Sequence, residues 1–256
     1  MHSGNEKYVG QGFAASRIPR SSIWITSKLW NAAHRPVDVK PALEKTLSDL
    51  GVDYLDLYLM HWPVAFDPTK KGSVIDEKTS ILDTWLAMKQ LVRAGLTKNI
   101  GISNFAKHQV ETIFKHCRIC PAAHEFETHP YLQQSEFVRW HREQGIQVIA
   151  YSPFANLNPI YDSKIPSILE DPFFTSLAAV KNVTIPQLVL AWGMQRETVV
   201  IPKSVHKERI LENFGASNVW LSETEMKLIA LQDRKARFNN PSKSWGVDLF
   251  DDLDGA

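Results

Sequence analysis

The chain alternates short apolar runs with longer amphipathic stretches, and this alternation limits the folds that it can adopt. Six apolar runs have the length and composition of buried strands, and each is followed by apolar residues at helical spacing. The predicted strands are 23–29, 55–61, 98–103, 122–127, 147–151 and 198–202. The predicted helices are 37–50, 81–94, 107–116, 133–143, 173–181 with 185–195, 205–216 and one near 223–232. Apolar strands that alternate with helices indicate a parallel sheet covered by helices.

Two folds fit a parallel sheet of this kind. The repeat of about 30 to 45 residues suits a (β/α)8 TIM barrel. A barrel needs eight strands, so the sequence predicts one that lacks the first two, with residues 5–15 as the end of an earlier helix. A doubly wound sheet is the alternative, weakened because no G-x-G-x-x-G follows the first strand. Residues 1–256 are treated as one incomplete barrel domain, since about 250 residues fit a single barrel.

Composition excludes several classes of partner. The 29 Lys and Arg residues nearly balance 28 Asp and Glu residues, for a formal net charge of +1, and no basic stretch predicts a nucleic-acid partner. No run approaches the ~20 apolar residues that cross a bilayer, and the first residues have no apolar leader, so we expect no membrane partner and a cytoplasmic location. The two cysteines, Cys117 and Cys120, have the spacing of a redox pair or half a zinc site, but without a second pair the spacing favours two ordinary cysteines.

Polar side chains end several predicted strands, where a barrel builds its active site. Lys28 and His61 end two neighbouring strands and place an ammonium beside an imidazole. The other strand-end residues are Ser103, Asn104, Glu125, Glu127, Tyr151 and Ser152. Lys28 and His61 together are therefore the candidate catalytic pair.

The segment after the last strand has the features of an anion site. Lys203 and Ser204 precede a predicted helix, and Arg209 follows about one and a half turns later. Main-chain amides at a helix start, with a lysine and an arginine, bind phosphate, and barrels often hold phosphate after their seventh and eighth strands.

Seven motifs, in order along the chain, give the sequence a resemblance to a known family. They are SKLWN around Lys28, LDLYLMHWP around His61, GISNF at 101–105, HPYLQQ at 129–134, AYSPF at 150–154, IPKS at 201–204 and ENF at 212–214. With them the chain resembles the aldo-keto reductase family, fungal members especially, over nearly its whole length. The resemblance implies a (β/α)8 barrel that binds NADP(H) and reduces small-molecule aldehydes or ketones.

The same resemblance implies roles for individual residues. His61 and Lys28 would belong to the catalytic tetrad, while Tyr151 would stack on the nicotinamide ring. The remaining implied cofactor-binding residues are Ser103, Asn104 and Glu125 for the carboxamide, Ser152 beside Tyr151, Lys203, Ser204 and Arg209 for the 2′-phosphate, and Glu212 and Asn213 for the adenine.

Three departures from the family pattern affect the expected chemistry. The family's Tyr-x-Asn-Glu motif supplies the general acid, and the corresponding stretch here begins with Ser3. The tetrad aspartate would lie five residues earlier, ahead of Met1. Glu125 stands where the family has a glutamine, and when ionised it keeps an acceptor but loses the donor.

These observations leave three hypotheses. The first is an NADPH-dependent carbonyl reductase, the second a family member that catalyses dehydration, isomerisation or cyclisation, and the third a binding protein that keeps only the cofactor site. Trp30, Trp62 and Trp245 are candidate pocket walls and favour an apolar or aromatic substrate. An incomplete barrel exposes a sheet edge, which predicts a homodimer through that edge.

Overall fold

The computed structural model describes residues 4–157 and 164–255. Their contacts form two compact units, one of residues up to His124 with Ser244–Val247, and one of Glu125–Lys243 with residues from Asp248 onward. The prediction of a single domain stays a prediction. Ser3, at the position where the resemblance implies a tyrosine, lies outside the described residues.

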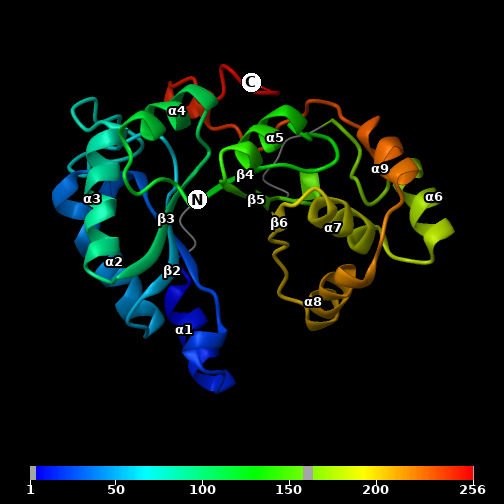
Figure 1. Ribbon diagram of the computed structural model, residues 1–256, viewed down its shortest axis with the longest axis horizontal. Coiled ribbons are helices and arrows are strands. Elements are labelled where there is room, and N and C mark those ends of the chain that lie inside the picture. The colour runs from blue at the N-terminus through cyan, green and yellow to red at the C-terminus, as the bar shows by residue number, and fades with distance from the viewer. Residues whose placement is uncertain (1–3, 158–163, 256) are drawn as a thin grey trace. The chain divides into compact units, whose positions relative to one another are not determined.

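The first unit contains three complete strands and their helices (Figure 1). Its elements are α1 (Glu6–Ser16), β1 (Thr26–Leu29), α2 (Pro36–Leu50), β2 (Leu55–Met60), α3 (Ile81–Arg93), β3 (Thr97–Ser103) and α4 (Lys107–His116). β1 pairs in parallel with β2, and β2 with β3. Helix α2 packs against β1 and α3 against β3, so each helix covers the strand beside it. The predicted β-α units are therefore present in this order.

The second unit continues the alternation (Figure 1). Its elements are α5 (Ser135–Glu143), β5 (Gln147–Tyr151), α6 (Pro172–Lys181), α7 (Ile185–Gln195), β6 (Val199–Val200), α8 (Lys207–Phe214) and α9 (Glu223–Ala230). β5 and β6 pair in parallel. The boundary between the units falls within β4 (Ala123–Glu127), and the short α10 (Ser242–Trp245) also spans it. The strand order in the sheet is β1 to β6 without a crossover, as a barrel requires and a doubly wound sheet does not.

Local sequence explains where these elements begin and why they pack. Ser80 caps α3, because its hydroxyl accepts from the Asp83 amide at 3.1 Å while the Asp83 carboxylate accepts from the Ser80 amide at 3.2 Å. Gly101 in β3 permits the close approach of β4, since a Cβ there would collide with the Ala123 carbonyl. Two strands are shorter than predicted. β1 begins at Thr26 rather than at residue 23, and β6 has only two residues rather than the predicted 198–202.

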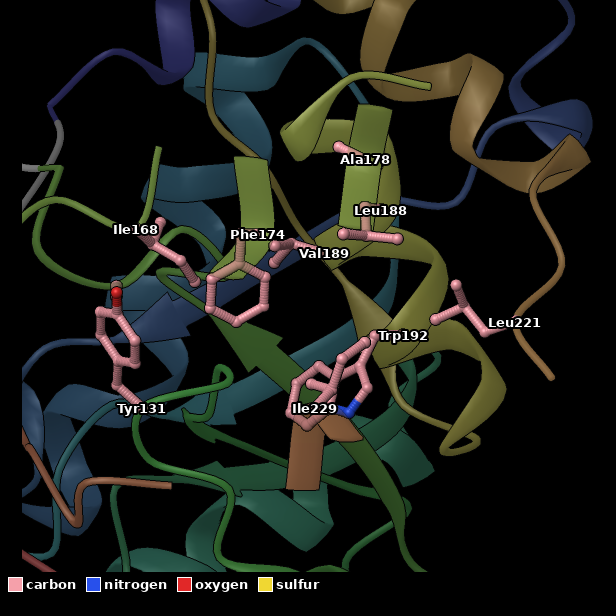
Figure 2. Packing of buried hydrophobic residues seen from close by; sticks show 10 residues of the cluster. Tyr131, Ile168, Phe174, Ala178, Leu188, Val189, Trp192, Leu221 and Ile229 are labelled. Atoms are coloured by element: carbon pink, nitrogen blue, oxygen red, sulfur yellow. The ribbon is translucent and has the colours of Figure 1, made fainter. Parts of the chain in front are cut away.

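A hydrophobic cluster forms the core of the second unit (Figure 2). Phe174 from α6 lies against Val189 from α7, and Trp192 extends the cluster toward Leu221 and Ile229. The other members are Tyr131, Ala155, Ile168, Ala178 and Leu188. Side chains buried this completely typically contribute ~1.5–3 kcal/mol each, so α6, α7 and α9 are fixed against one another.

Two of these helices, α6 and α7, are also the most apolar among the described residues. In the described residues no single helix is long and apolar enough to cross a membrane. α6 and α7 together reach that length and composition, but they are bent by 87° at the break between them.

The two cysteines correct one expectation from the sequence. Cys117 and Cys120 form a disulfide rather than two separate thiols. The chain turns sharply after α4 and brings their Cα atoms to 5.0 Å, within the range that a disulfide spans.

Candidate active site

Parallel pairing brings Lys28 and His61 into one cavity in the first unit. Lys28 pairs with Leu59 across β1 and β2, and the His61 amide, just after β2, donates to the Leu29 carbonyl at 3.1 Å. Both side chains line a cavity of about 280 Å³. The cavity also contains Asn5 and Glu6 from the start of α1, so a carboxylate lies in the same space as the ammonium and the imidazole.

A buried carboxylate fixes the start of the strand that carries Lys28. Asp56 in β2 accepts from the Ile25 amide at 2.9 Å, from Arg20 at 2.8 Å and from Lys98 at 2.9 Å. Burial opposes ionisation of this group, but the three donors outweigh burial and hold the pKa of Asp56 below its ordinary value. The ionised Asp56 therefore ties β1 to β2 beside the cavity.

Ser103 and Asn104 lie against the backbone of His61. The Asn104 side-chain amide donates to the His61 carbonyl and to the Ser103 hydroxyl, each at 3.0 Å. Asn104 has a left-handed backbone (φ 61°), a conformation that asparagine tolerates better than most residues. Both residues are buried. The structure thus brings four sequence-predicted residues together at the ends of β1, β2 and β3.

An aromatic cluster lies beside His61 in the same unit. The His61 ring meets Trp30 edge-on with centroids 5.2 Å apart, and Trp245 meets Trp62 at 5.0 Å. Phe66 completes the cluster, with its ring 5.1 Å from Trp245. The three tryptophans predicted as pocket walls are therefore neighbours. Phe66 was missed because it lies in the loop after β2, where no periodicity marks an inward-facing position.

The second unit contains a larger cavity, of about 800 Å³, after β5 and β6. Six of the residues predicted to bind cofactor line it, namely Ser152, Lys203, Ser204, Arg209, Glu212 and Asn213. Phe154, Leu157 and Pro186 add apolar surface to it. Tyr151 and Glu125 lie in the same unit, but neither is a lining residue of this cavity.

Backbone geometry and charge give this cavity the character of an anion site. Ser152 and Ala155 both have left-handed φ values, 47° and 56°, which turn the chain sharply after β5. Lys203 and Arg209 are exposed, and neither has an acidic group within ion-pair distance in the part of the chain that the structure describes. Two cations that no carboxylate neutralises fit a phosphate group well.

Tyr151 is held by a residue that sequence reasoning did not find. Its hydroxyl accepts from the Asn239 side-chain amide at 3.0 Å. Asn239 lies 88 residues further along the chain, in a segment without helical or strand periodicity, so no local signal marks it.

Comparison with known proteins relates the chain to one family. Residues 2–232 match the model of the aldo/keto reductase family. An aldo/keto reductase of Synechocystis is 42% identical over 248 residues, which are 92% of this chain and 76% of that protein. Aldo-keto reductase family 1 member A1 of Sus scrofa is 39% identical over 251 residues, 93% of this chain and 77% of that protein.

Solved structures agree with the sequence relatives. The aldo-keto reductase AKR2E4 of Bombyx mori, determined in complex with NADP, superimposes with a TM-score of 0.89 at 32% identity, over 96% of this chain and 80% of that chain. The aldose reductase of Giardia lamblia gives a TM-score of 0.86 at 37% identity, over 96% and 86%. The predicted fold, a barrel of this type represented here by six strands, is confirmed.

Proposed function

Because the chain belongs to the aldo/keto reductase family, we propose that it is an oxidoreductase that uses NADP(H) to reduce the carbonyl group of a small aldehyde or ketone. The cofactor is NADP(H), as in the reductases of Bombyx mori that were solved with NADP and with NADPH. The observation that carries the proposal is the cavity with Lys203 and Arg209, whose two cations have no acidic partner within the described residues.

Different residues of this cavity bind different parts of the cofactor. Lys203 and Arg209 bind the 2′-phosphate, and the Ser204 hydroxyl adds a hydrogen bond. Glu212 and Asn213 offer an acceptor and a donor to the adenine, and Phe154 offers an aromatic face. Ser103 and Asn104 bind the carboxamide, and Tyr151 provides the surface on which the nicotinamide stacks.

NADPH, when bound, supplies the hydride. The residues of the first unit must then manage the negative charge that develops on the carbonyl oxygen. His61 donates a hydrogen bond or a proton to that oxygen, and the Lys28 ammonium stabilises its charge. Trp30 lines the same cavity and offers apolar surface beside His61, which favours substrates with a flat apolar group.

Cofactor selectivity tests the proposal. We expect Arg209→Ala to weaken NADPH binding by roughly tenfold or more, the scale of a lost charge-assisted hydrogen bond, and to leave NADH binding nearly unchanged because NADH has no 2′-phosphate. Titration calorimetry measures both affinities. Glu208→Ala is the matched control, since Glu208 precedes Arg209 on α8 but does not line the cavity. Equal affinities of the unaltered protein for NADPH and NADH would contradict the assignment.

The two other hypotheses from the sequence give different outcomes in activity assays. A reductase oxidises NADPH when an aldehyde or ketone is added. A dehydratase, isomerase or cyclase forms product without consuming NADPH, and a binding protein does neither. The predicted homodimer stays a prediction, which sedimentation equilibrium would test.

A further inference from the structure

A segment near the end of the chain lies along the loop that follows β4, within the second unit. We call residues 234–239 the strap. The main-chain amides of Arg234 and Ala236 both donate to the Tyr131 carbonyl, at 3.1 and 3.0 Å. The strap has no helix of its own, so these hydrogen bonds determine where it lies.

Glu127 anchors the far end of the strap. One carboxylate oxygen accepts from the Phe238 amide at 2.9 Å, and the other accepts from the Asn239 amide at 2.8 Å. The His129 ring also contacts this carboxylate through Nε2, at 2.9 Å, and its face lies against the Phe238 ring with centroids 5.4 Å apart. The Glu127 and His129 side chains are fully buried. Hydrogen bonds to a buried charged acceptor are stronger than neutral ones, so this anchor holds the last two strap residues firmly.

The charge on Glu127 is stable at neutral pH. Burial opposes its ionisation, but His129 and the amides of Phe238 and Asn239 together outweigh burial and hold the pKa of Glu127 below its ordinary value. The anchor therefore acts as a carboxylate with three hydrogen-bonded partners, two of which are strap amides.

The strap ends on the side chain that the proposed function places under the nicotinamide. Asn239, half-buried, uses its backbone amide to bind Glu127 and its side-chain amide to bind the Tyr151 hydroxyl at 3.0 Å. Tyr151 is the last residue of β5. A tyrosine ring turns about two side-chain torsions, and a hydrogen bond at its outer end restricts both. The position of Asn239 thus restricts the plane of the Tyr151 ring.

We propose that Glu127 and Asn239 are positioning residues: Glu127 fixes the end of the strap, and Asn239, held there, fixes the Tyr151 ring in the orientation on which the nicotinamide stacks. That the nicotinamide stacks on Tyr151 rests on the proposed function. The series of hydrogen bonds from Glu127 through Asn239 to Tyr151 is observed in this structure. Fixing the ring before the cofactor arrives lowers the ordering cost of binding. The effect belongs to the nicotinamide end of the cofactor and not to its 2′-phosphate end.

Fluorine NMR of the cofactor-free protein tests the positioning directly. The tyrosines are replaced by 3-fluorotyrosine, and Tyr151→Phe identifies the resonance of Tyr151. We expect Asn239→Ala and Glu127→Gln each to shift and broaden this resonance. Asn240→Ala is the matched control. The Asn240 side chain accepts from the Ser242 amide at 3.0 Å, whereas the Tyr151 hydroxyl accepts from Asn239. We expect it to leave the resonance in place.

Calorimetry with two probes then locates the effect on binding. We expect Asn239→Ala to weaken NADP⁺ by roughly 2- to 10-fold, the range that corresponds to one neutral hydrogen bond. Adenosine 2′,5′-bisphosphate lacks the nicotinamide, and we expect its affinity to be unchanged. Kinetically, the Asn239 variant should lower kcat for the carbonyl substrate more than it changes the KM for that substrate.

The outcomes separate this inference from the proposed function. An unmoved Tyr151 resonance in Asn239→Ala would overturn the inference, and a resonance that moves in Asn239→Ala but not in folded Glu127→Gln would overturn the role of Glu127. An equal loss of affinity for both probes would also overturn it. Failure of the unaltered protein to bind either probe would refute the proposed function and the stacking role with it, while the NMR result would still decide whether the strap fixes the ring. Asn239→Ala carries the test even if Glu127→Gln does not fold.

Discussion

Asp171 offers the sharpest test of what stabilises the second unit. Its carboxylate is buried and accepts three hydrogen bonds: from the Phe173 amide at 2.9 Å, from the Tyr131 hydroxyl at 2.7 Å and from the Arg234 guanidinium at 2.6 Å. The first of these caps α6, and the other two fix Tyr131 and the start of the strap. One side chain therefore serves two structural purposes that substitutions can separate.

Asp171→Asn keeps the shape and the helix cap but removes the charge. The new amide group faces a guanidinium, so the charge-assisted bond to Arg234 is lost, which typically costs ~1.5–3 kcal/mol. Arg234 remains one-third exposed and can regain water, so we expect about 2 kcal/mol. Asp171→Ala also removes the cap, worth about 1 kcal/mol, and leaves the buried Tyr131 hydroxyl without its acceptor, for a total of about 4 kcal/mol.

Equilibrium unfolding in urea, followed by tryptophan fluorescence at pH 7, measures these differences. Ser222→Ala is the control for a lost cap alone, because Ser222 caps α9 at an exposed position and should cost only about 1 kcal/mol. If Asp171→Asn unfolds within about 0.5 kcal/mol of the unaltered protein, or if Asp171→Ala is no worse than Ser222→Ala, the reasoning about the buried charge is refuted.

Three further outcomes follow from other parts of the chain. His61→Ala should lower carbonyl turnover at least tenfold, in contrast to His116→Ala at the exposed end of α4; equal turnover in steady-state assays would place the chemistry elsewhere. Burial lowers the pKa of His141 to about 4 despite its bond to the Phe137 carbonyl, so the unfolded chain takes up a proton first and stability should fall between pH 6.5 and 4. His141→Gln should reduce this fall in urea midpoints measured across that range but not remove it, because burial also lowers the pKa of His34 to about 4. Dithiothreitol should lower the free energy of unfolding by no more than about 2 kcal/mol, because the Cys117–Cys120 loop is short, and should not affect the double serine variant.

Periodicity predicted most of the fold because most elements bury one continuous apolar face. The bounds of α4 and β5 agree with the sequence prediction to the residue. β1 and β6 were predicted too long for a physical reason. Trp24, inside the first apolar run, is 65% exposed, and Pro202, at the end of the last, has no amide to donate to a neighbouring strand. An apolar run therefore predicts that a strand exists better than it predicts where pairing ends.

The candidate site was predictable where it depends on strand ends and was not where it depends on distant loops. Lys28 and His61 share a cavity because parallel strands place their carboxyl ends at one edge, which the strand pattern implies. Glu127 was visible as a polar residue at a strand end, but its two partners in the strap lie more than 100 residues away. Phe66 and Asn239 have no periodic neighbours, and only long-range contacts define their positions.

The strap is held at both ends, so the free energy of unfolding and the orientation of the Tyr151 ring can be changed separately. Asp171 holds the strap at Arg234, and Glu127 holds it at Phe238 and Asn239, four to five residues further along. Between these points the Tyr131 carbonyl holds the backbone at Ala236. Loss of the Asp171 contact therefore frees only the Arg234 side chain, because the Tyr131 carbonyl still holds the Arg234 backbone and the Glu127 anchor still holds the last two strap residues. Asp171→Asn should accordingly lower the free energy of unfolding and leave the Tyr151 resonance in place, because the hydrogen bond that orients the ring begins at the other end of the strap.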